Sequence, residues 1–155
     1  MNREKHIFIN KIRCSGCGNC TLACSFEKEG LFQPVKSRIH IVEGDLAGFT
    51  PHVCRNCEDA PCLEACPAGA ILRREGSGSI YLDEAKCEEC NMCIMVCPFN
   101  AISRGEGANL KCDTCDGQTP CVESCKLGAI IFVDPDKDSK QKRRKILQML
   151  RQELS

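Results

Sequence analysis

The chain has 155 residues and equal numbers of acidic and basic side chains, so its formal net charge is zero. This balance gives no electrostatic reason to bind nucleic acid, and no apolar run approaches the ~20 residues that span a bilayer. The sequence offers little for an ordinary core, with no Trp, one Tyr and six Phe, yet Cys occupies sixteen positions. A small domain of this composition usually needs disulfides or metals to stabilise it.

The position and spacing of the cysteines favour metal binding over disulfides. The first residues, MNREKHIFINKIRC, contain no apolar segment and no small-residue cleavage site that would mark a secreted protein. Disulfide frameworks are typical of secreted domains, whereas most cysteines here lie in Cys-x-x-Cys steps or their close extensions. We therefore expect reduced thiols and a cytoplasmic location, unless a folded partner with its own export signal takes the chain along.

Four copies of one cysteine motif follow each other along the chain. In each copy the first two cysteines are three residues apart and the last two are four residues apart. The four copies are Cys14, Cys17, Cys20 and Cys24; Cys54, Cys57, Cys62 and Cys66; Cys87, Cys90, Cys93 and Cys97; and Cys112, Cys115, Cys121 and Cys125. The last three copies then continue alike, as CPAGAI, CPFNAI and CKLGAI.

This spacing suits cubane [4Fe–4S] clusters. Three thiolates within seven to ten residues form a loop around one face of a cluster, and the backbone N–H groups of that loop point at the sulfides. One helical turn then carries the fourth cysteine toward a neighbouring cluster, as in bacterial ferredoxins. Structural zinc, the competing metal, takes two ligands from each of two knuckles, which does not suit a third nearby cysteine. The sixteen thiolates thus predict four [4Fe–4S] clusters, with the motifs used in pairs.

The pairing of the motifs has two alternatives. Residues 70–74 and 80–83 read as two strands around a Glu-Gly-Ser-Gly turn, the hairpin expected inside a two-cluster ferredoxin unit. Motifs two and three also both end in Cys-Pro, whereas motifs one and four do not. These features favour a nested arrangement, two with three and one with four. Tandem pairing, one with two and three with four, stays open.

The composition changes after the last motif. Residues 139–155, SKQKRRKILQMLRQELS, form a basic stretch with Ile146, Met149, Leu150 and Leu154 on one stripe, which predicts a helix. We expect a cluster domain over residues 1–136 and a basic C-terminal helix over residues 137–155. The helix either folds back on its own domain or docks on a partner, including a second copy of the chain.

The remaining polar residues predict no enzyme site. His6, His40 and His52 are scattered and share no ligand spacing, and we expect them to be ordinary polar residues. Nothing in the chain looks like a substrate site, a dinucleotide-binding fingerprint or a nucleophile–base pair. We therefore expect a non-catalytic protein whose chemistry belongs to its partner.

The sixteen-cysteine pattern over residues 14–133 resembles the four-cluster ferredoxin-like subunits of molybdenum and tungsten oxidoreductases, hydrogenases and carbon monoxide dehydrogenases. Residues 24–39, CSFEKEGLFQPVKSRI, resemble the small iron–sulfur subunit that accompanies tungsten aldehyde oxidoreductases. The resemblance implies an α+β fold of two nested bacterial-ferredoxin-like two-cluster units with a C-terminal helical tail. The outer unit comprises motifs 14–24 and 112–125, and the inner unit comprises motifs 54–66 and 87–97.

The resemblance also implies the ligands of each cluster. The four ligand sets are Cys14, Cys17, Cys20 and Cys125; Cys112, Cys115, Cys121 and Cys24; Cys54, Cys57, Cys62 and Cys97; and Cys87, Cys90, Cys93 and Cys66. The chain departs from larger family members because it lacks their long insertions and their C-terminal membrane anchor, and because Lys126 replaces the usual Pro in motif four. We therefore expect no direct insertion into a membrane.

The function implied by the resemblance is electron transfer. We expect the chain to relay single electrons between a catalytic tungsten or molybdenum subunit of the aldehyde oxidoreductase type and a second redox partner, either a ferredoxin or a flavin- or NAD-binding subunit. Self-association through the tail is a further expectation. The alternatives are a subunit of a hydrogenase or carbon monoxide dehydrogenase, and a polyferredoxin without a fixed partner.

Overall fold

The computed structural model describes residues 6–44, 48–133 and 147–148. This part of the chain is α+β, with short helices and two-stranded antiparallel sheets, so the predicted fold class is confirmed at that level. Of the predicted tail over residues 137–155, only Leu147 and Gln148 are among the described residues. None of the helices in these ranges is long and apolar enough to cross a membrane.

The two ends of the described chain lie together. Strand β1 (His6–Ile9) pairs with β8 (Ile130–Val133), and helix α1 (Asn19–Glu29) packs against α4 (Pro120–Ser124). Strands β2 (His40–Gly44) and β3 (Gly48–His52) form a hairpin beside them. The sequence pattern did not predict this hairpin. We call residues 6–53 and 112–133 the outer lobe.

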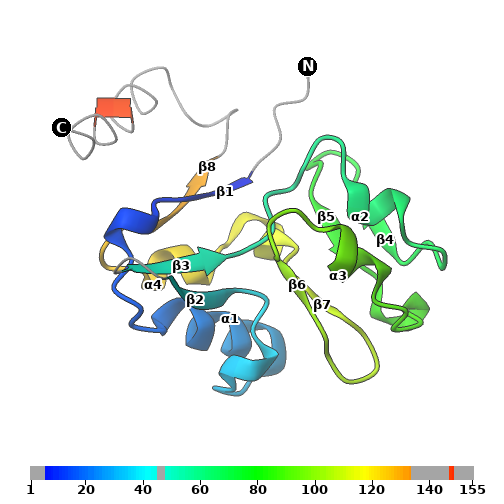
Figure 1. Cartoon of the computed structure of the whole chain (residues 1–155), viewed down its shortest axis with the longest axis horizontal. Coiled ribbons are helices and arrows are strands. Elements are labelled where there is room, and N and C mark those ends of the chain that lie inside the picture. Colours follow the sequence, from blue (N-terminus) through cyan, green and yellow to red (C-terminus); the bar gives the residue numbers. More distant parts are fainter. Residues whose placement is uncertain (1–5, 45–47, 134–146, 149–155) are drawn as a thin grey trace.

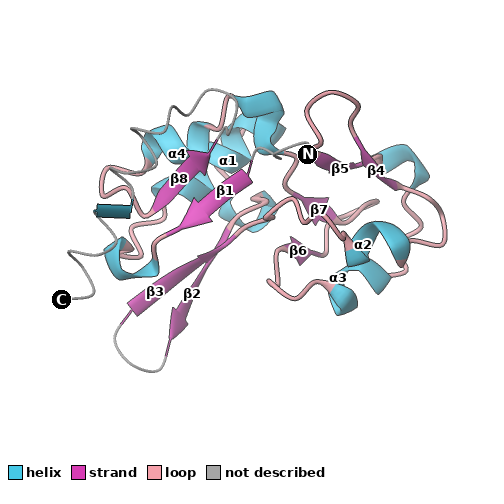
Figure 2. Cartoon of the chain, turned by 90° about the horizontal axis from the view of Figure 1, so that it is seen from above, coloured by secondary structure: helices cyan, strands magenta, loops and turns pink. Residues whose placement is uncertain are grey.

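The middle of the chain forms a second group of elements, the inner lobe, over residues 54–111. Strands β4 (Ile71–Arg73) and β5 (Ile80–Leu82) pair as the hairpin predicted between motifs two and three. Helix α2 (Pro61–Glu64) packs against α3 (Met92–Val96), and β6 (Ile102–Ser103) pairs with β7 (Leu110–Lys111). The outer and inner lobes lie on opposite sides of the molecule in both views (Figures 1 and 2).

Each motif places its third cysteine on a short helix, as the spacing predicted. The helix begins directly before or at that cysteine, and Pro61 and Pro120 occupy the first positions of α2 and α4. Proline is favoured there because its fixed φ suits the first helical turn and that turn needs no N–H from it. Only α1 continues beyond its motif, for a total of 11 residues.

Cysteine sulfur forms much of the core. Large side chains that are almost completely buried are few and aliphatic, and they include Ile7, Ile39 and Ile130. Buried cysteines lie among them in the outer lobe, and Cys62 and Cys93 lie among isoleucines in the inner lobe. The polypeptide therefore surrounds its thiols mainly with aliphatic side chains, and Phe132 packs against the outer-lobe cluster of buried side chains from its edge.

A close contact at Gly16 fixes the β2–β3 hairpin against the first cysteine loop. Gly16 has a φ of +73°, and a Cβ atom added there would lie 2.6 Å from the ring carbons of Phe49 on β3. Gly30 has a similar φ of +68° but no atom within 4 Å of the corresponding position. The two glycines thus share a backbone requirement and differ in the space around them.

Alanine substitution separates these two effects. Gly30→Ala should lower the free energy of unfolding by about 1 kcal/mol, the cost of a left-handed backbone for an ordinary residue. Gly16→Ala should cost a further ~1–3 kcal/mol, because the added methyl group overlaps the Phe49 ring. Guanidinium unfolding of the cluster-loaded protein measures both. Equal effects of the two substitutions would show that the Phe49 contact is not tight in solution.

Candidate cluster-binding sites

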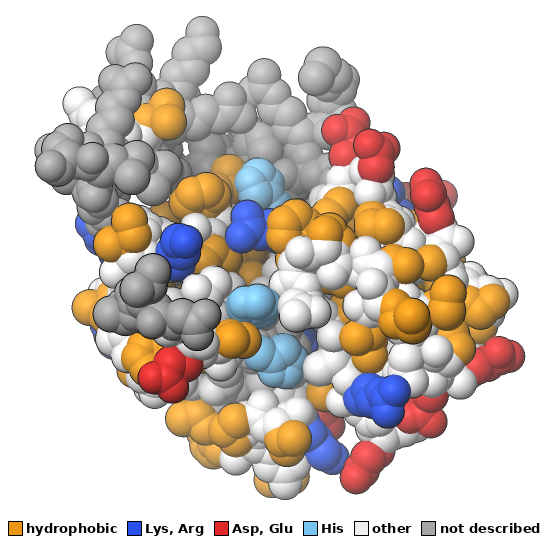
Figure 3. Space-filling view, viewed as in Figure 1, with side chains coloured by type: hydrophobic (Ala, Val, Ile, Leu, Met, Phe, Trp, Pro, Cys, Tyr) orange, Lys and Arg blue, Asp and Glu red, His pale blue; other side chains and the backbone are white. Residues whose placement is uncertain are grey.

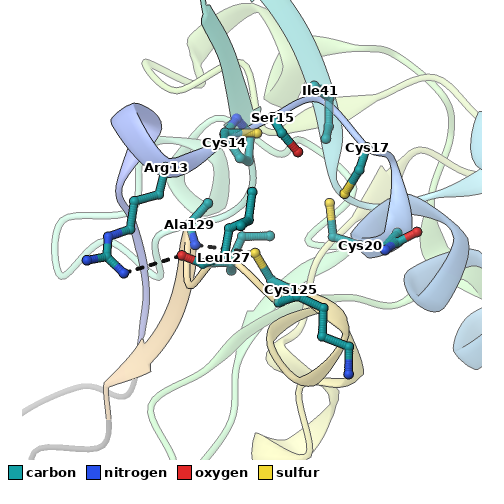
Figure 4. Close-up of a pocket in the computed structure, with 13 residues that line it drawn as sticks. Arg13, Cys14, Ser15, Cys17, Cys20, Ile41, Cys125, Leu127 and Ala129 are labelled. Atoms are coloured by element: carbon teal, nitrogen blue, oxygen red, sulfur yellow. Dashed lines mark hydrogen bonds between the residues drawn. The ribbon is translucent and has the colours of Figure 1, made fainter.

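The clearest site is a cavity in the outer lobe between the first cysteine loop and the end of α4. Its volume is about 200 Å³, and the thiols of Cys14, Cys17, Cys20 and Cys125 face into it (Figure 4). Ile41 and Pro51 of the β2–β3 hairpin and Leu127 complete its apolar wall. A space of this size holds a group of several atoms, since one water needs only about 10–15 Å³ by this measure.

The second set of thiols lies deeper in the same lobe. Cys24, Cys112, Cys115 and Cys121 line a cavity of about 10 Å³, which has room for about one water. A cubane cluster would fit there only after these four side chains had turned outward around it. Within the described ranges, no three His, Cys, Asp or Glu side chains are arranged to hold one metal ion.

The inner lobe contains the other two groups of thiols. Cys62 lies near Cys54, Cys57 and Cys97, whose charges raise its pKa. Cys93 lies near Cys87 and Cys66, whose charges raise its pKa. Cys90 is exposed at the surface. All sixteen cysteines lie in the described ranges and all are free of disulfides. In all four groups, the fourth predicted ligand lies near thiols of a different motif.

Burial makes these thiols difficult to ionise. It raises the pKa of Cys20 and Cys121 to about 12 and that of Cys62 and Cys115 to about 11. For Cys20 and Cys121, charges on neighbouring thiols contribute to this rise. Iron must therefore displace a proton from each thiol that it binds, and the bound cation then stabilises the thiolates that burial alone disfavours.

The repeated sequence after motifs two, three and four provides a hydrogen-bond donor to the last cysteine of each motif. In all three, the backbone N–H four residues later donates to the cysteine Sγ. The three bonds run from Ala70 to Cys66 at 3.3 Å, from Ala101 to Cys97 at 3.4 Å and from Ala129 to Cys125 at 3.3 Å. The residue before each alanine has a positive φ, which directs the N–H back at the sulfur: Gly69 at 60°, Asn100 at 50° and Gly128 at 66°. Glycine and asparagine adopt this conformation most readily, which explains why these types recur.

Other donors reach the sulfurs from outside the motifs. The backbone N–H of Arg38 donates to Cys24 Sγ at 3.3 Å, and the Asn109 side chain donates to Cys93 Sγ at 3.4 Å. The Lys111 ammonium donates to Cys54 Sγ at 3.3 Å. Hydrogen bonds to sulfur tune the reduction potential of a cluster. The sequence analysis missed all three donors because they follow no cysteine spacing.

The four groups of thiols are neighbours in the order first, second, third and fourth, and we call this succession the row. Burial is the main cause of the raised pKa of Cys121 and Cys112 in the second group. The charge of Cys20 in the first group adds to the rise for Cys121, and that of Cys54 in the third adds to the rise for Cys112. Cys62 and Cys93, of the third and fourth groups, lie in one cluster of buried side chains. Of the sixteen cysteines, Cys17 and Cys90 are exposed. They belong to the first and the last group of the row.

Two of the three histidines lie close together in the structure. His40 and His52 face each other across the β2–β3 hairpin, and His40 Nε2 lies 3.0 Å from Ser103 Oγ of the inner lobe. Burial lowers the pKa of His40, and His52 lowers it further. Neither histidine of the pair is a predicted cluster ligand.

Comparison with known proteins identifies the family of the chain. Residues 46–135 match the family model described as a 4Fe-4S dicluster domain. The chain is 40% identical to the polyferredoxin-like subunit of the aliphatic sulfonate oxidoreductase of Pyrococcus furiosus, over 77% of this chain and 70% of that protein. It is 39% identical to the beta subunit of the NADH-dependent phenylglyoxylate dehydrogenase of Aromatoleum evansii, over 80% of this chain but 29% of that longer protein.

A solved structure of the BamBC active-site complex of benzoyl coenzyme A reductase aligns with 94% of this chain and 89% of its own, with a TM-score of 0.49 and 23% identity. The family match covers more than half of the sequence, and the sixteen cysteines suffice for four clusters. The cofactors are [4Fe–4S] clusters, and the chain belongs to the 4Fe-4S dicluster domain family.

Proposed function

We propose that this chain is the non-catalytic electron-transfer subunit of an oxidoreductase complex and relays single electrons through four [4Fe–4S] clusters. The observation that supports this most is the row of four thiol groups, whose first and last members include the exposed Cys17 and Cys90. A relay needs one accessible cluster at each end, where electrons enter and leave, and buried clusters between them.

The ligand sets belong to the same proposal. Three cysteines of one motif and the last cysteine of its nested partner bind each cluster, as the resemblance implied. The cavity lined by Cys14, Cys17, Cys20 and Cys125 supports the outer pairing, because it combines motif one with the end of motif four. The packing of α2 against α3 supports the inner pairing. Tandem pairing would need Cys66 in the first set in place of Cys125.

The two ends of the row have opposite surface charge. Exposed Lys11 and Lys126 flank the Cys17 end, beside exposed Ile12 and Leu127. At the other end, exposed Glu88 and Glu89 lie next to Cys90, beside the exposed side chains of Met92 and Met95. Figure 3 shows apolar side chains gathered over the inner lobe, with acidic side chains at the rim. Opposite charges of this kind favour two different partners, one for each end.

The proposed partners are a catalytic tungsten or molybdenum subunit of the aldehyde oxidoreductase type and a second redox protein. The resemblance of residues 24–39 supports the first, and the sulfonate oxidoreductase relative supports an oxidoreductase complex in general. The NADH-dependent relative supports a flavin- or NAD-binding subunit as the second. We place this complex in the cytoplasm, where thiols stay reduced before clusters are assembled.

Metal analysis combined with a reductive titration tests the function. Anaerobically purified chain should contain about sixteen iron and about sixteen acid-labile sulfide, and should accept about four electrons, since each cubane takes one. Stoichiometric zinc without sulfide would contradict the assignment. Full iron content with fewer than two reducible clusters would leave an iron–sulfur protein but would exclude a relay.

A serine substitution tests the nested pairing. Cys125→Ser should damage the cluster of Cys14, Cys17 and Cys20 and leave the two clusters of the inner lobe intact, because the cavity combines these four residues. Cys97→Ser is the matched control and should damage an inner cluster instead. Electron paramagnetic resonance and iron content measure both. Loss of the cluster bound by Cys87, Cys90 and Cys93 in Cys125→Ser would establish tandem pairing.

A further inference from the structure

Lys111, the last residue of β7, lies at the junction between the lobes. Its side chain is buried, with 5% of the residue exposed. The Nζ atom donates to Cys54 Sγ at 3.3 Å, to the Ile80 carbonyl at 2.6 Å and to the Cys112 carbonyl at 3.0 Å. Buried lysines are rare unless they are paired, so this position needs an explanation.

The contacts of the Lys111 side chain match its charged form. All three partners are acceptors, and an ammonium group has three N–H donors and no acceptor. A neutral amine would offer two donors to three acceptors and leave its own lone pair without a donor. The hydrogen bonds of Nζ therefore satisfy an ammonium ion fully and a neutral amine only in part.

Lys111 also lies between two of the proposed clusters. It precedes Cys112, a ligand of the second cluster, and it contacts Cys54, a ligand of the third. These clusters occupy the outer and inner lobes respectively, so every electron in the relay passes between them. The Nζ atom lies within hydrogen-bond distance of the Cys54 sulfur in the third group and of the Cys112 carbonyl in the second, so its positive charge adjoins both groups.

Lys28 provides a contrast within the same region. Its ammonium also lies near the second group of thiols, but it forms an ion pair with Asp113 at 2.6 Å. The Asp113 carboxylate opposes the effect of the Lys28 charge at the Cys115 sulfur, although Lys28 has the larger effect. The Lys111 ammonium instead donates to a thiol sulfur and two carbonyls, so its charge is directed at the cluster ligands.

We propose that Lys111 is a positioning residue for electron transfer, whose buried ammonium raises the reduction potential of the cluster bound by Cys54, Cys57, Cys62 and Cys97 and so lets electrons cross between the lobes. This inference rests on the proposed relay. A cubane with four thiolates carries a charge of about −2 when oxidised and −3 when it has accepted one electron. A fixed positive charge at a ligand sulfur stabilises the reduced form more, because the attraction grows with the charge.

The test compares reduction potentials of single clusters in the full chain, measured by electron paramagnetic resonance during an anaerobic potentiometric titration. Lys111→Gln removes the charge and keeps a hydrogen-bond donor. It should lower the equilibrium constant for reduction of one inner-lobe cluster at least tenfold, which is about 59 mV for a one-electron couple. Lys111→Arg retains the charge and should restore most of the shift.

Lys126→Met is the matched control, because Lys126 also adjoins a predicted ligand, Cys125, but is exposed. It lines the cavity of the first group in the outer lobe, so the potentials of the two inner-lobe clusters should stay at their original values. Iron content and circular dichroism verify that each variant is folded and loaded. If Lys111→Gln does not retain its iron, Lys111→Met, which keeps the hydrocarbon stem, takes its place.

Two results would overturn the proposal. In one, the neutral variants contain all four clusters with unchanged potentials, so the charge has no effect. In the other, Lys111→Arg shifts the potential as far as Lys111→Gln does, which indicates a role in packing alone. Failure of the relay itself would be visible separately, as missing iron or missing reducible clusters in the unsubstituted chain.

Discussion

Buried thiols that bind iron place negative charge in the interior, and the rest of the structure must stabilise that charge. Burial holds the pKa of Cys20 and Cys121 near 12, so these side chains enter the core as neutral thiols and become thiolates only when iron replaces their protons. Four thiolates around each [4Fe–4S] core then leave net negative charge in the interior. Backbone N–H groups, the Asn109 amide and the Lys111 ammonium all point toward sulfur, which is the arrangement that such charge requires.

The same constraint explains how the two lobes are joined. Arg38 is buried and forms ion pairs with Glu29 of α1 and, at 3.3 Å, with Glu84 of the inner lobe. Its backbone N–H donates to Cys24, so one residue links a cluster ligand to both lobes. Arg38 therefore joins the two lobes beside a predicted cluster ligand.

The spacing of the cysteines was sufficient to predict the local structure of the motifs. It predicted the short helix at the third cysteine, and the strand pattern of residues 70–83 around the Glu-Gly-Ser-Gly turn predicted the β4–β5 hairpin. Both depend on residues close in sequence. The β2–β3 hairpin escaped prediction because Pro51 and two glycines interrupt its pattern, although its cross-strand register is regular. The facing His40 and His52 follow from that hairpin. The role of Lys111 could not be predicted for a different reason. Its partners Cys54 and Ile80 are 57 and 31 residues away in sequence, and only the packed structure brings them together.

We expect the clusters, and not the polypeptide alone, to provide the core around which this chain folds. Removing iron anaerobically with a chelator and measuring the radius of gyration by small-angle X-ray scattering tests it most directly. A chain of this length should have a radius of about 15 Å when folded and about 40 Å when unfolded. We predict that the iron-free chain approaches the larger value and shows no cooperative thermal transition. An iron-free chain that keeps a radius near 15 Å and unfolds cooperatively would contradict the account.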